Sequence, residues 1–223
     1  MLIAVVVGAI LVGAGIIYFS PKEIRYAGIK PKSLSFRSDL IEADLSKGLF
    51  DEVISECRRA QKVHPSDPNI HNLLAQAYHG KEMWDDEIRE RQKVIELNPD
   101  WPETEWAALY NNLGVAYMEK DDYDRAIKEC EKAIEFWPEN AEAYNNLGYA
   151  FGQKDKWDEA IEMYRRALGF KPGFREVRYN LALALAQTGS FEEAWKEVRL
   201  AEELGYPTQP LIDELKKIFP EPE

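Results

Sequence analysis

Cysteine and positive charge are both scarce in this chain. Only two cysteines occur among 223 residues, Cys57 and Cys130, and no C-x-x-C pair or Cys/His set has metal-ligand spacing. The sequence therefore carries no disulfide framework. Lys and Arg number 28 against 40 Asp and Glu, which gives a formal net charge of -12. Because a nucleic-acid binder needs a basic surface to neutralise phosphates, we expect no nucleic-acid partner.

Patterns that carry catalysis are also missing. His64, His71 and His79 form no i, i+4 pair, and no set of acidic ligands accompanies them. The sequence has no glycine-rich phosphate loop and no G-x-S-x-G motif. The acidic pairs Asp85-Asp86 and Asp121-Asp122 stand where helices are predicted to begin, so capping explains them better than acid–base chemistry. We expect no enzyme, no cofactor and no metal site.

Charged residues are absent from the first stretch of the chain. Leu2–Phe19 runs for 18 positions without one, and as a helix it would span roughly 27 Å, close to the hydrocarbon thickness of a bilayer. We predict a transmembrane helix or signal anchor over residues 1–20 and a juxtamembrane linker over 21–33. A cleavable signal peptide is the alternative, although no Lys or Arg precedes the run and no A-x-A-like site ends it.

The charges after this run predict the topology of the anchor. Five basic residues follow it within a short distance: Lys22, Arg25, Lys30, Lys32 and Arg37. Under the positive-inside rule, a single-pass membrane protein with these flanks keeps its C-terminal domain in the cytoplasm. An exported domain is the alternative topology.

A 34-residue period governs the rest of the chain. The stretch YNNLG begins at Tyr110 and again at Tyr144, and the same spacing divides the chain into five units: 34–67, 68–101, 107–140, 141–174 and 175–208. Position 17 of each unit is aromatic: Phe50, Trp84, Tyr123, Trp157 and Phe191. Positions 20 and 27 are small or apolar in every unit except at Glu87, and position 32 is proline in the first four units.

Each unit reads as two amphipathic helices separated by a short break. In the third unit, apolar residues recur with helical spacing on both sides of Lys120–Asp122. Pro138 stops the second helix, because a proline ring cannot continue it. Gly114 and Gly148 lie inside predicted helices, where glycine costs roughly 1 kcal/mol relative to alanine. We therefore expect a neighbouring helix to pack closely against them.

This pattern resembles the tetratricopeptide repeat over residues 34–208. The fourth unit carries the resemblance best, through Tyr144, Leu147, Gly148, Phe151, Ala160, Tyr164, Ala167 and Pro172. The resemblance implies an all-α fold, a right-handed superhelix (α-solenoid) of about five helix pairs whose first helices line an inner groove. In the family this groove receives an extended peptide or a helix of a partner. A capping helix is predicted over 209–219, where apolar and charged residues separate onto two faces.

Three features depart from the regular pattern. Unit one is degenerate, as expected of an end repeat with one exposed face. Glu87 stands where alanine is expected, which puts the packing of unit two in doubt. Five extra residues, 102–106, separate units two and three, and their proline and acids predict a longer first helix.

Asparagine is the one polar residue that repeats on the first helices. Asn112, Asn146 and Asn180 occupy position 6 of three consecutive units, and Asn111 and Asn145 precede two of them. An amide side chain offers both a donor and an acceptor, so a ladder of amides can pair with a peptide backbone of any sequence. Similar ladders occur in the repeats of O-linked N-acetylglucosamine transferases. Neutral lining of the groove, without a ligand, is the alternative.

Other binding modes find less support. The cations of the carboxylate clamp, which captures chaperone C-termini in this family, are missing from positions 2, 5 and 6 of units three to five. Four tryptophans fall outside the repeat signature and either anchor a partner or fill the seam around the insertion: Trp101, Trp106, Trp137 and Trp195.

The prediction is a membrane-tethered scaffold that binds a partner peptide or helix in its groove. The alternatives are a self-assembling structural protein that forms homo-oligomers through its repeats, and a regulatory subunit of a membrane-associated enzyme or secretion complex.

Overall fold

The structure is a computed structural model that describes residues 9–12, 15–18 and 44–219. The chain divides into two compact units, Met1–Lys47 and Gly48–Glu223, and each is described by itself.

The N-terminal unit contains two short strands where a helix was predicted. Strands β1 (Ala9–Val12) and β2 (Gly15–Tyr18) pair antiparallel, with Ala9 opposite Tyr18 and Val12 opposite Gly15. The predicted transmembrane helix is therefore wrong over these eight residues. Four of the eight strand residues are β-branched, Ile10, Val12, Ile16 and Ile17, and β-branched residues favour extended backbone over helix. The remainder of the predicted span, the linker over 21–33 and most of the first helix of unit one lie outside the described residues.

Within residues 9–12, 15–18 and 44–219, no helix is both long enough and apolar enough to cross a membrane.

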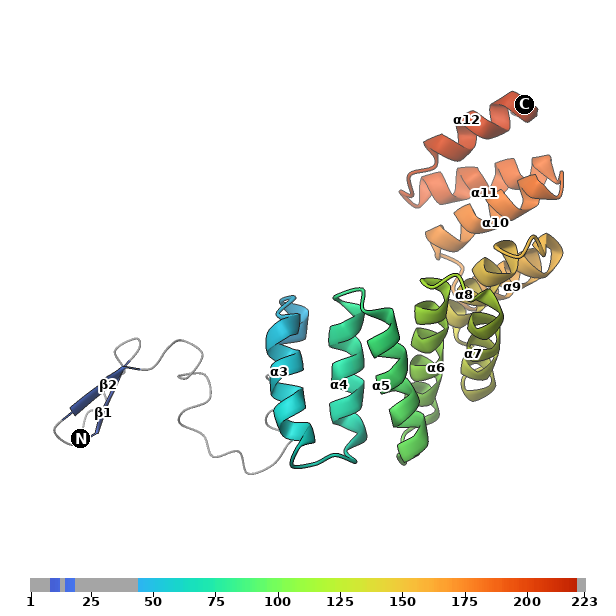
Figure 1. The fold of residues 1–223 in the computed structure, drawn as a ribbon. Coiled ribbons are helices and arrows are strands. Elements are labelled where there is room, and N and C mark those ends of the chain that lie inside the picture. The colour runs from blue at the N-terminus through green and yellow to red at the C-terminus, as the bar shows by residue number, and fades with distance from the viewer. Residues whose placement is uncertain (1–8, 13–14, 19–43, 220–223) are drawn as a thin grey trace. The chain divides into compact units, whose positions relative to one another are not determined.

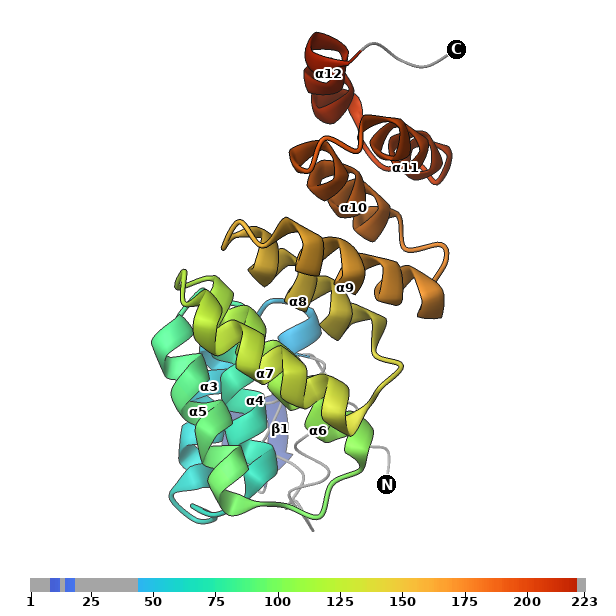
Figure 2. The ribbon, with the colours of Figure 1, turned by 90° about the vertical axis from the view of Figure 1, so that its right-hand side faces the viewer.

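The second unit is built from consecutive helices, each packed against the next (Figures 1 and 2). They are α3 (Phe50–Gln61), α4 (Pro68–His79), α5 (Trp84–Leu97), α6 (Glu103–Met118), α7 (Tyr123–Phe136), α8 (Ala141–Gly152), α9 (Trp157–Phe170), α10 (Arg175–Gln187), α11 (Phe191–Glu203) and α12 (Gln209–Ile218). Among the first helices, α8 also contacts α6 and α10 directly, whereas unit two meets α6 chiefly through α5.

Short polar side chains begin several of these helices. Asp67 accepts a hydrogen bond from the backbone N–H of Asn69 at 2.9 Å, and Asn140 accepts one from Ala143 at 3.0 Å. Asp122 accepts one from Arg125 at 3.1 Å, as expected for an acid at this break. Each bond satisfies an N–H group that has no partner inside the helix.

Glycine allows the two helices of a unit to approach closely. A Cβ atom at Gly114 would lie 2.7 Å from Sγ of Cys130, and one at Gly148 would lie 2.7 Å from Cε1 of Tyr164. Both distances are shorter than van der Waals contact, so no larger residue fits without movement. The reason predicted for glycine at these two positions is confirmed.

The insertion between units two and three lengthens a helix and adds an aromatic cluster. Helix α6 has 16 residues, whereas α8 has 12. Trp106, at its start, lies 5.9 Å from Tyr110 and 5.8 Å from Phe136 between ring centroids, and Trp101 lies 5.9 Å from Trp106. Trp106 is buried here, so it fills the seam around the insertion.

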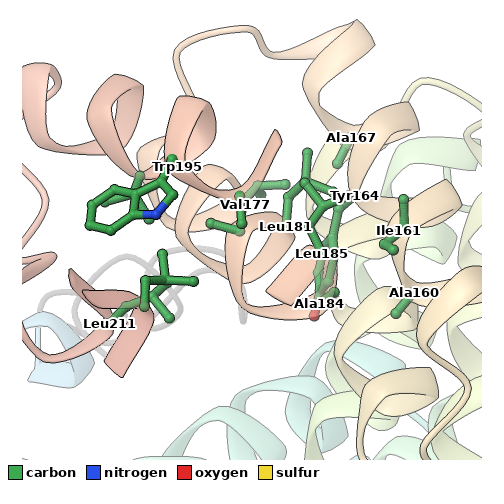
Figure 3. Packing of buried hydrophobic residues seen from close by; sticks show 14 of the residues in the cluster. Ala160, Ile161, Tyr164, Ala167, Val177, Leu181, Ala184, Leu185, Trp195 and Leu211 are labelled. Carbon is green, nitrogen blue, oxygen red and sulfur yellow. The ribbon is translucent and has the colours of Figure 1, made fainter. Parts of the chain in front are cut away.

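The C-terminal helix closes one end of the core. Figure 3 shows Trp195 of α11 near Leu211 of α12, and Val177 of α10 lies between this pair and Leu181 and Leu185. The indole N–H of Trp195 donates to the backbone oxygen of Phe219 at 3.2 Å. Leu211 and Leu215 are buried, whereas Ile218 in the last turn of α12 is 65% exposed.

Unit two buries charged groups at the place where other units have small residues. Glu87 is 0% exposed, and its Oε1 accepts hydrogen bonds from the guanidinium of Arg91, with Nε and Nη2 each 2.8 Å away. Nδ1 of His79 lies 3.1 Å from the other carboxylate oxygen, and this hydrogen bond raises the pKa of His79. The sequence put the packing of unit two in doubt at Glu87, and the structure shows that Arg91 pairs with this carboxylate inside the unit.

Candidate functional site

The asparagines of three first helices form one hydrogen-bonded chain. Nδ2 of Asn180 on α10 donates to Oδ1 of Asn145 on α8 at 3.1 Å. Nδ2 of Asn145 donates to Oδ1 of its neighbour Asn146 at 3.4 Å. Nδ2 of Asn146 donates in turn to Oδ1 of Asn111 on α6 at 2.9 Å. Four of the five asparagines singled out in the sequence are therefore joined across three helices.

The chain leaves hydrogen-bonding capacity unused. A carboxamide has two N–H donors and two acceptor lone pairs, and each link uses one donor and one acceptor. Asn145 and Asn146, in the middle, each keep one donor and one acceptor lone pair. All four side chains are half-buried rather than enclosed. The row therefore presents donors and acceptors that another molecule can reach.

The links join different positions of neighbouring units, which the sequence did not indicate. The prediction was a ladder along position 6, whereas each inter-unit bond runs from position 6 of one unit to position 5 of the unit before it. Asn112, at position 6 of unit three, makes no hydrogen bond through its side chain within residues 44–219. The side chain of Asn72, at position 5 of unit two, likewise makes no hydrogen bond within these residues.

Ion pairs neutralise the acids that border the asparagine chain on one side. One helical turn before the asparagines, Glu142 lies 2.8 Å from Nζ of Lys171, and this hydrogen bond lowers the pKa of the Glu142 carboxyl. Glu176 lies 3.1 Å from Nε of Arg175. Despite the net charge of -12, these paired carboxylates leave the region around the asparagines close to neutral.

Apolar side chains border the asparagine chain on the other side. One turn further along the same helices stand Val115 on α6, Tyr149 on α8 and Leu183 on α10. Tyr149 is 42% exposed, and its hydroxyl makes no hydrogen bond within the described part of the chain. Val115 and Leu183 are half-buried. We call these three residues the apolar row.

The other residues considered in the sequence, including His71, Trp195 and Trp137, lie outside the asparagine chain. His71 is buried between Glu90, 2.6 Å from Nδ1, and the backbone oxygen of Pro65, 3.1 Å from Nε2. Trp195 belongs to the core, whereas Trp137 is 40% exposed at the end of α7. Across the helices and strands that the structure describes, no group of three or more His, Cys, Asp or Glu is arranged to hold a metal ion.

The two cysteines are free and buried. Burial raises the pKa of the Cys57 and Cys130 thiols to about 12. Both thiols are therefore protonated and unreactive at neutral pH, since the thiolate is the nucleophile.

Comparisons with known proteins identify the repeats. Two sequence models, each described as tetratricopeptide repeat, match residues 106–172 and 146–205. No curated protein matches the sequence. The predicted tetratricopeptide repeats are thus confirmed.

Three solved structures share this fold at low sequence identity to this chain. A crystal structure of MamA is 26% identical with a TM-score of 0.67, and the match covers 83% of this chain and 94% of MamA. PilF of Pseudomonas aeruginosa is 21% identical with a TM-score of 0.70, covering 82% of each chain. YrrB, described as a TPR protein with an unusual peptide-binding site, is 18% identical with a TM-score of 0.66, covering 80% of this chain and 89% of YrrB. The all-helical, solenoid-like arrangement of the helices from α3 onward is the fold they share.

Proposed function

We propose that this protein is a scaffold that binds a peptide segment of a partner protein along α6, α8 and α10. The observation that carries the proposal is the hydrogen-bonded chain of Asn180, Asn145, Asn146 and Asn111. Every peptide residue except proline offers one backbone donor and one acceptor, which is what the middle amides of this chain leave unused.

The bonds between the asparagines favour binding in a second way. Side chains that already hold one another in place lose less conformational freedom when a ligand arrives. An amide row also carries no net charge, so it can be covered without the large cost of burying an unpaired ion. The likeness to YrrB supports a peptide ligand as well, because that protein is described as having a peptide-binding site.

The asparagine hypothesis can be tested by a matched pair of variants. Asn145→Ala with Asn146→Ala removes the centre of the chain, whereas Asn72→Ala removes the same residue type at the same repeat position outside it. We expect the double variant to retain at least tenfold less partner in a crosslinking pull-down from native membranes, quantified by mass spectrometry. Asn72→Ala should retain the wild-type amount.

One outcome of that pull-down would contradict the proposed role of the asparagines. If the double variant keeps full helicity by circular dichroism and still recovers the same proteins in the same amounts, the asparagines are neutral lining. A triple variant, Asn112→Ala with Asn146→Ala and Asn180→Ala, extends the comparison to Asn112, which makes no bond to the chain.

Membrane tethering is a separate part of the proposal and rests on the sequence. The uncharged stretch Leu2–Phe19 would hold the scaffold at a membrane, and the basic residues after it favour a cytoplasmic repeat domain. Confinement raises the effective concentration of the groove near membrane-bound partners. Deleting residues 1–20 should move the protein from the alkali-resistant membrane pellet to the supernatant. An unchanged pellet fraction would refute the tether.

Self-assembly is the second candidate function. Val63, just after α3, and Ile218, at the end of α12, are large apolar residues that are 70% and 65% exposed, and contact with a second copy would remove their apolar surface from water. Sedimentation velocity of the full chain in detergent separates the two functions. A monomer at all concentrations leaves self-assembly without support.

A further inference from the structure

We propose that the peptide bound along α6, α8 and α10 adopts the polyproline II conformation and carries an apolar side chain at every third residue. This inference rests on the proposed function and names the shape and side-chain pattern of the ligand. Its basis is the spacing of the three helices, together with the apolar row that runs beside the asparagine chain.

The helix spacing selects one kind of extended backbone. Helix α8 contacts both α6 and α10, and the asparagine side chains of these neighbouring first helices are hydrogen-bonded to each other. Helices in contact generally have axes roughly 8–10 Å apart. Polyproline II has three residues per turn and rises about 3.1 Å per residue, so one face repeats every ~9 Å. A β-strand repeats one face every ~6.6 Å and an α-helix every ~5.4 Å. Of these three periods, that of polyproline II agrees with the spacing of packed helices.

The apolar row supplies contacts at this same spacing. Val115 and Tyr149 stand four residues after Asn111 and Asn145, and Leu183 stands three residues after Asn180. Each helix therefore offers one amide position and, one turn away, one apolar position. A ligand whose every third side chain is apolar would place consecutive anchors on Val115, Tyr149 and Leu183.

The amides fit the backbone of such a ligand. Polyproline II forms no internal hydrogen bonds, so its N–H and C=O groups point outward and remain available. An α-helical ligand has already used these groups within itself and would leave the spare amide donors and acceptors of Asn145 and Asn146 without partners. The row of amides and the row of apolar groups thus indicate the same ligand conformation.

The ends of the apolar row set the length of the ligand. Gln76 of α4 occupies the equivalent place in unit two and is polar, and α4 has no major contact with α6. Three anchors remain, and three anchors spaced three residues apart require a segment of seven residues.

Three labelled peptides of identical composition test the pattern. Each has 11 residues with three leucines among serine, alanine and glycine, placed at positions 3, 6 and 9, at 3, 5 and 7, or at 3, 7 and 11. Binding to the full-length protein in detergent micelles is measured by fluorescence anisotropy, with empty micelles as the blank. We expect the peptide with period three to bind at least tenfold more tightly than the other two.

Two further measurements probe the conformation and the contact. Proline at positions 4 and 7 of the period-three peptide should strengthen binding several-fold, because it preorganises polyproline II. Tyr149→Ser should weaken binding of this peptide at least fivefold. The matched control Trp137→Ser removes an aromatic side chain of similar exposure away from the first helices and should leave binding unchanged.

The outcomes separate this inference from the proposed function. Equal binding of all three peptides, or tightest binding of the peptide with helical spacing, overturns polyproline II recognition, and so does loss of binding on adding proline. If none of the peptides binds, the inference is also wrong. The pull-down with the asparagine variants still tests independently whether the asparagines bind a partner.

Discussion

Units two and three have the same pair of helices but different interiors. At positions 20 and 24, unit two has Glu87 and Arg91 in a buried ion pair, whereas unit three has Ala126 and Cys130. The second arrangement is compact enough to need Gly114 opposite Cys130. The comparison shows that the repeat specifies where two helices meet and leaves the chemistry of the contact open.

The same two units also differ on the asparagine-bearing face of their first helices. Asn72 and Asn111 share position 5, yet only Asn111 belongs to the hydrogen-bonded chain. Helix α6 packs directly against the next first helix, whereas α4 reaches unit three mainly through α5. An identical residue at an identical repeat position therefore has a different role, because its neighbours decide which groups lie within hydrogen-bonding distance.

The largest effect is expected from breaking the charged interior of unit two. Glu87→Ala leaves the buried guanidinium of Arg91 without its carboxylate, and removing one partner of a buried ion pair costs about 3–5 kcal/mol. We expect the free energy of unfolding, measured by urea titration with circular dichroism, to fall by about this amount.

A second variant turns unit two into a copy of unit three. Glu87→Ala combined with Arg91→Cys removes both charges and installs the residues found at positions 20 and 24 of the third unit. We expect it to recover at least half of the stability lost by Glu87→Ala. A double variant as unstable as the single one would show that lost packing, and not the uncompensated charge, causes the defect.

A smaller effect is expected from filling the close contact of unit three. Gly114→Ala places a methyl group 2.7 Å from Sγ of Cys130, and overpacking of this kind costs about 1–3 kcal/mol, part of which the better helix propensity of alanine offsets. The variant should be destabilised in urea by about 1 kcal/mol. Adding Cys130→Ala makes room for the methyl group, so a pair without any rescue would contradict the contact.

The smallest effect is expected at the ion pair that joins the two units. Lys120 of unit three pairs with Asp85 of unit two, and both side chains are partly exposed. Exposed ion pairs contribute about 0–1 kcal/mol and weaken as salt screens them. Lys120→Met should therefore lower the free energy of unfolding by less than 1 kcal/mol in low salt, with no difference from wild type in 1 M NaCl. A difference that persists in high salt would indicate that lysine acts through packing.

Much of the fold could be predicted because the repeat period is a local property of the sequence. The helical spacing, the glycines in close contact and the capping by Asp122 all follow from residues near one another in the chain. The Glu87–Arg91 pair also had a signal, since an acid and a base four residues apart share one helix face, but only the structure showed that this face is buried.

The site and the N-terminus were harder to predict. The asparagines could be chosen from the sequence, but their links run from position 6 of one unit to position 5 of the unit before it. That offset depends on how successive units are rotated, which no single unit specifies. In the apolar N-terminal stretch, the length of the run favoured a helix while its β-branched residues favoured strands, and the described residues there are strands.

The buried charge of unit two has a consequence for exchanging repeats between proteins. Glu87, Arg91 and His79 all belong to that one unit, so a transplanted unit would bring along the hydrogen-bonding partners of its buried charges. The asparagine chain is divided among three units, and removing any of them would interrupt it. The buried charges of unit two have their partners within one repeat, whereas recognition depends on three repeats together.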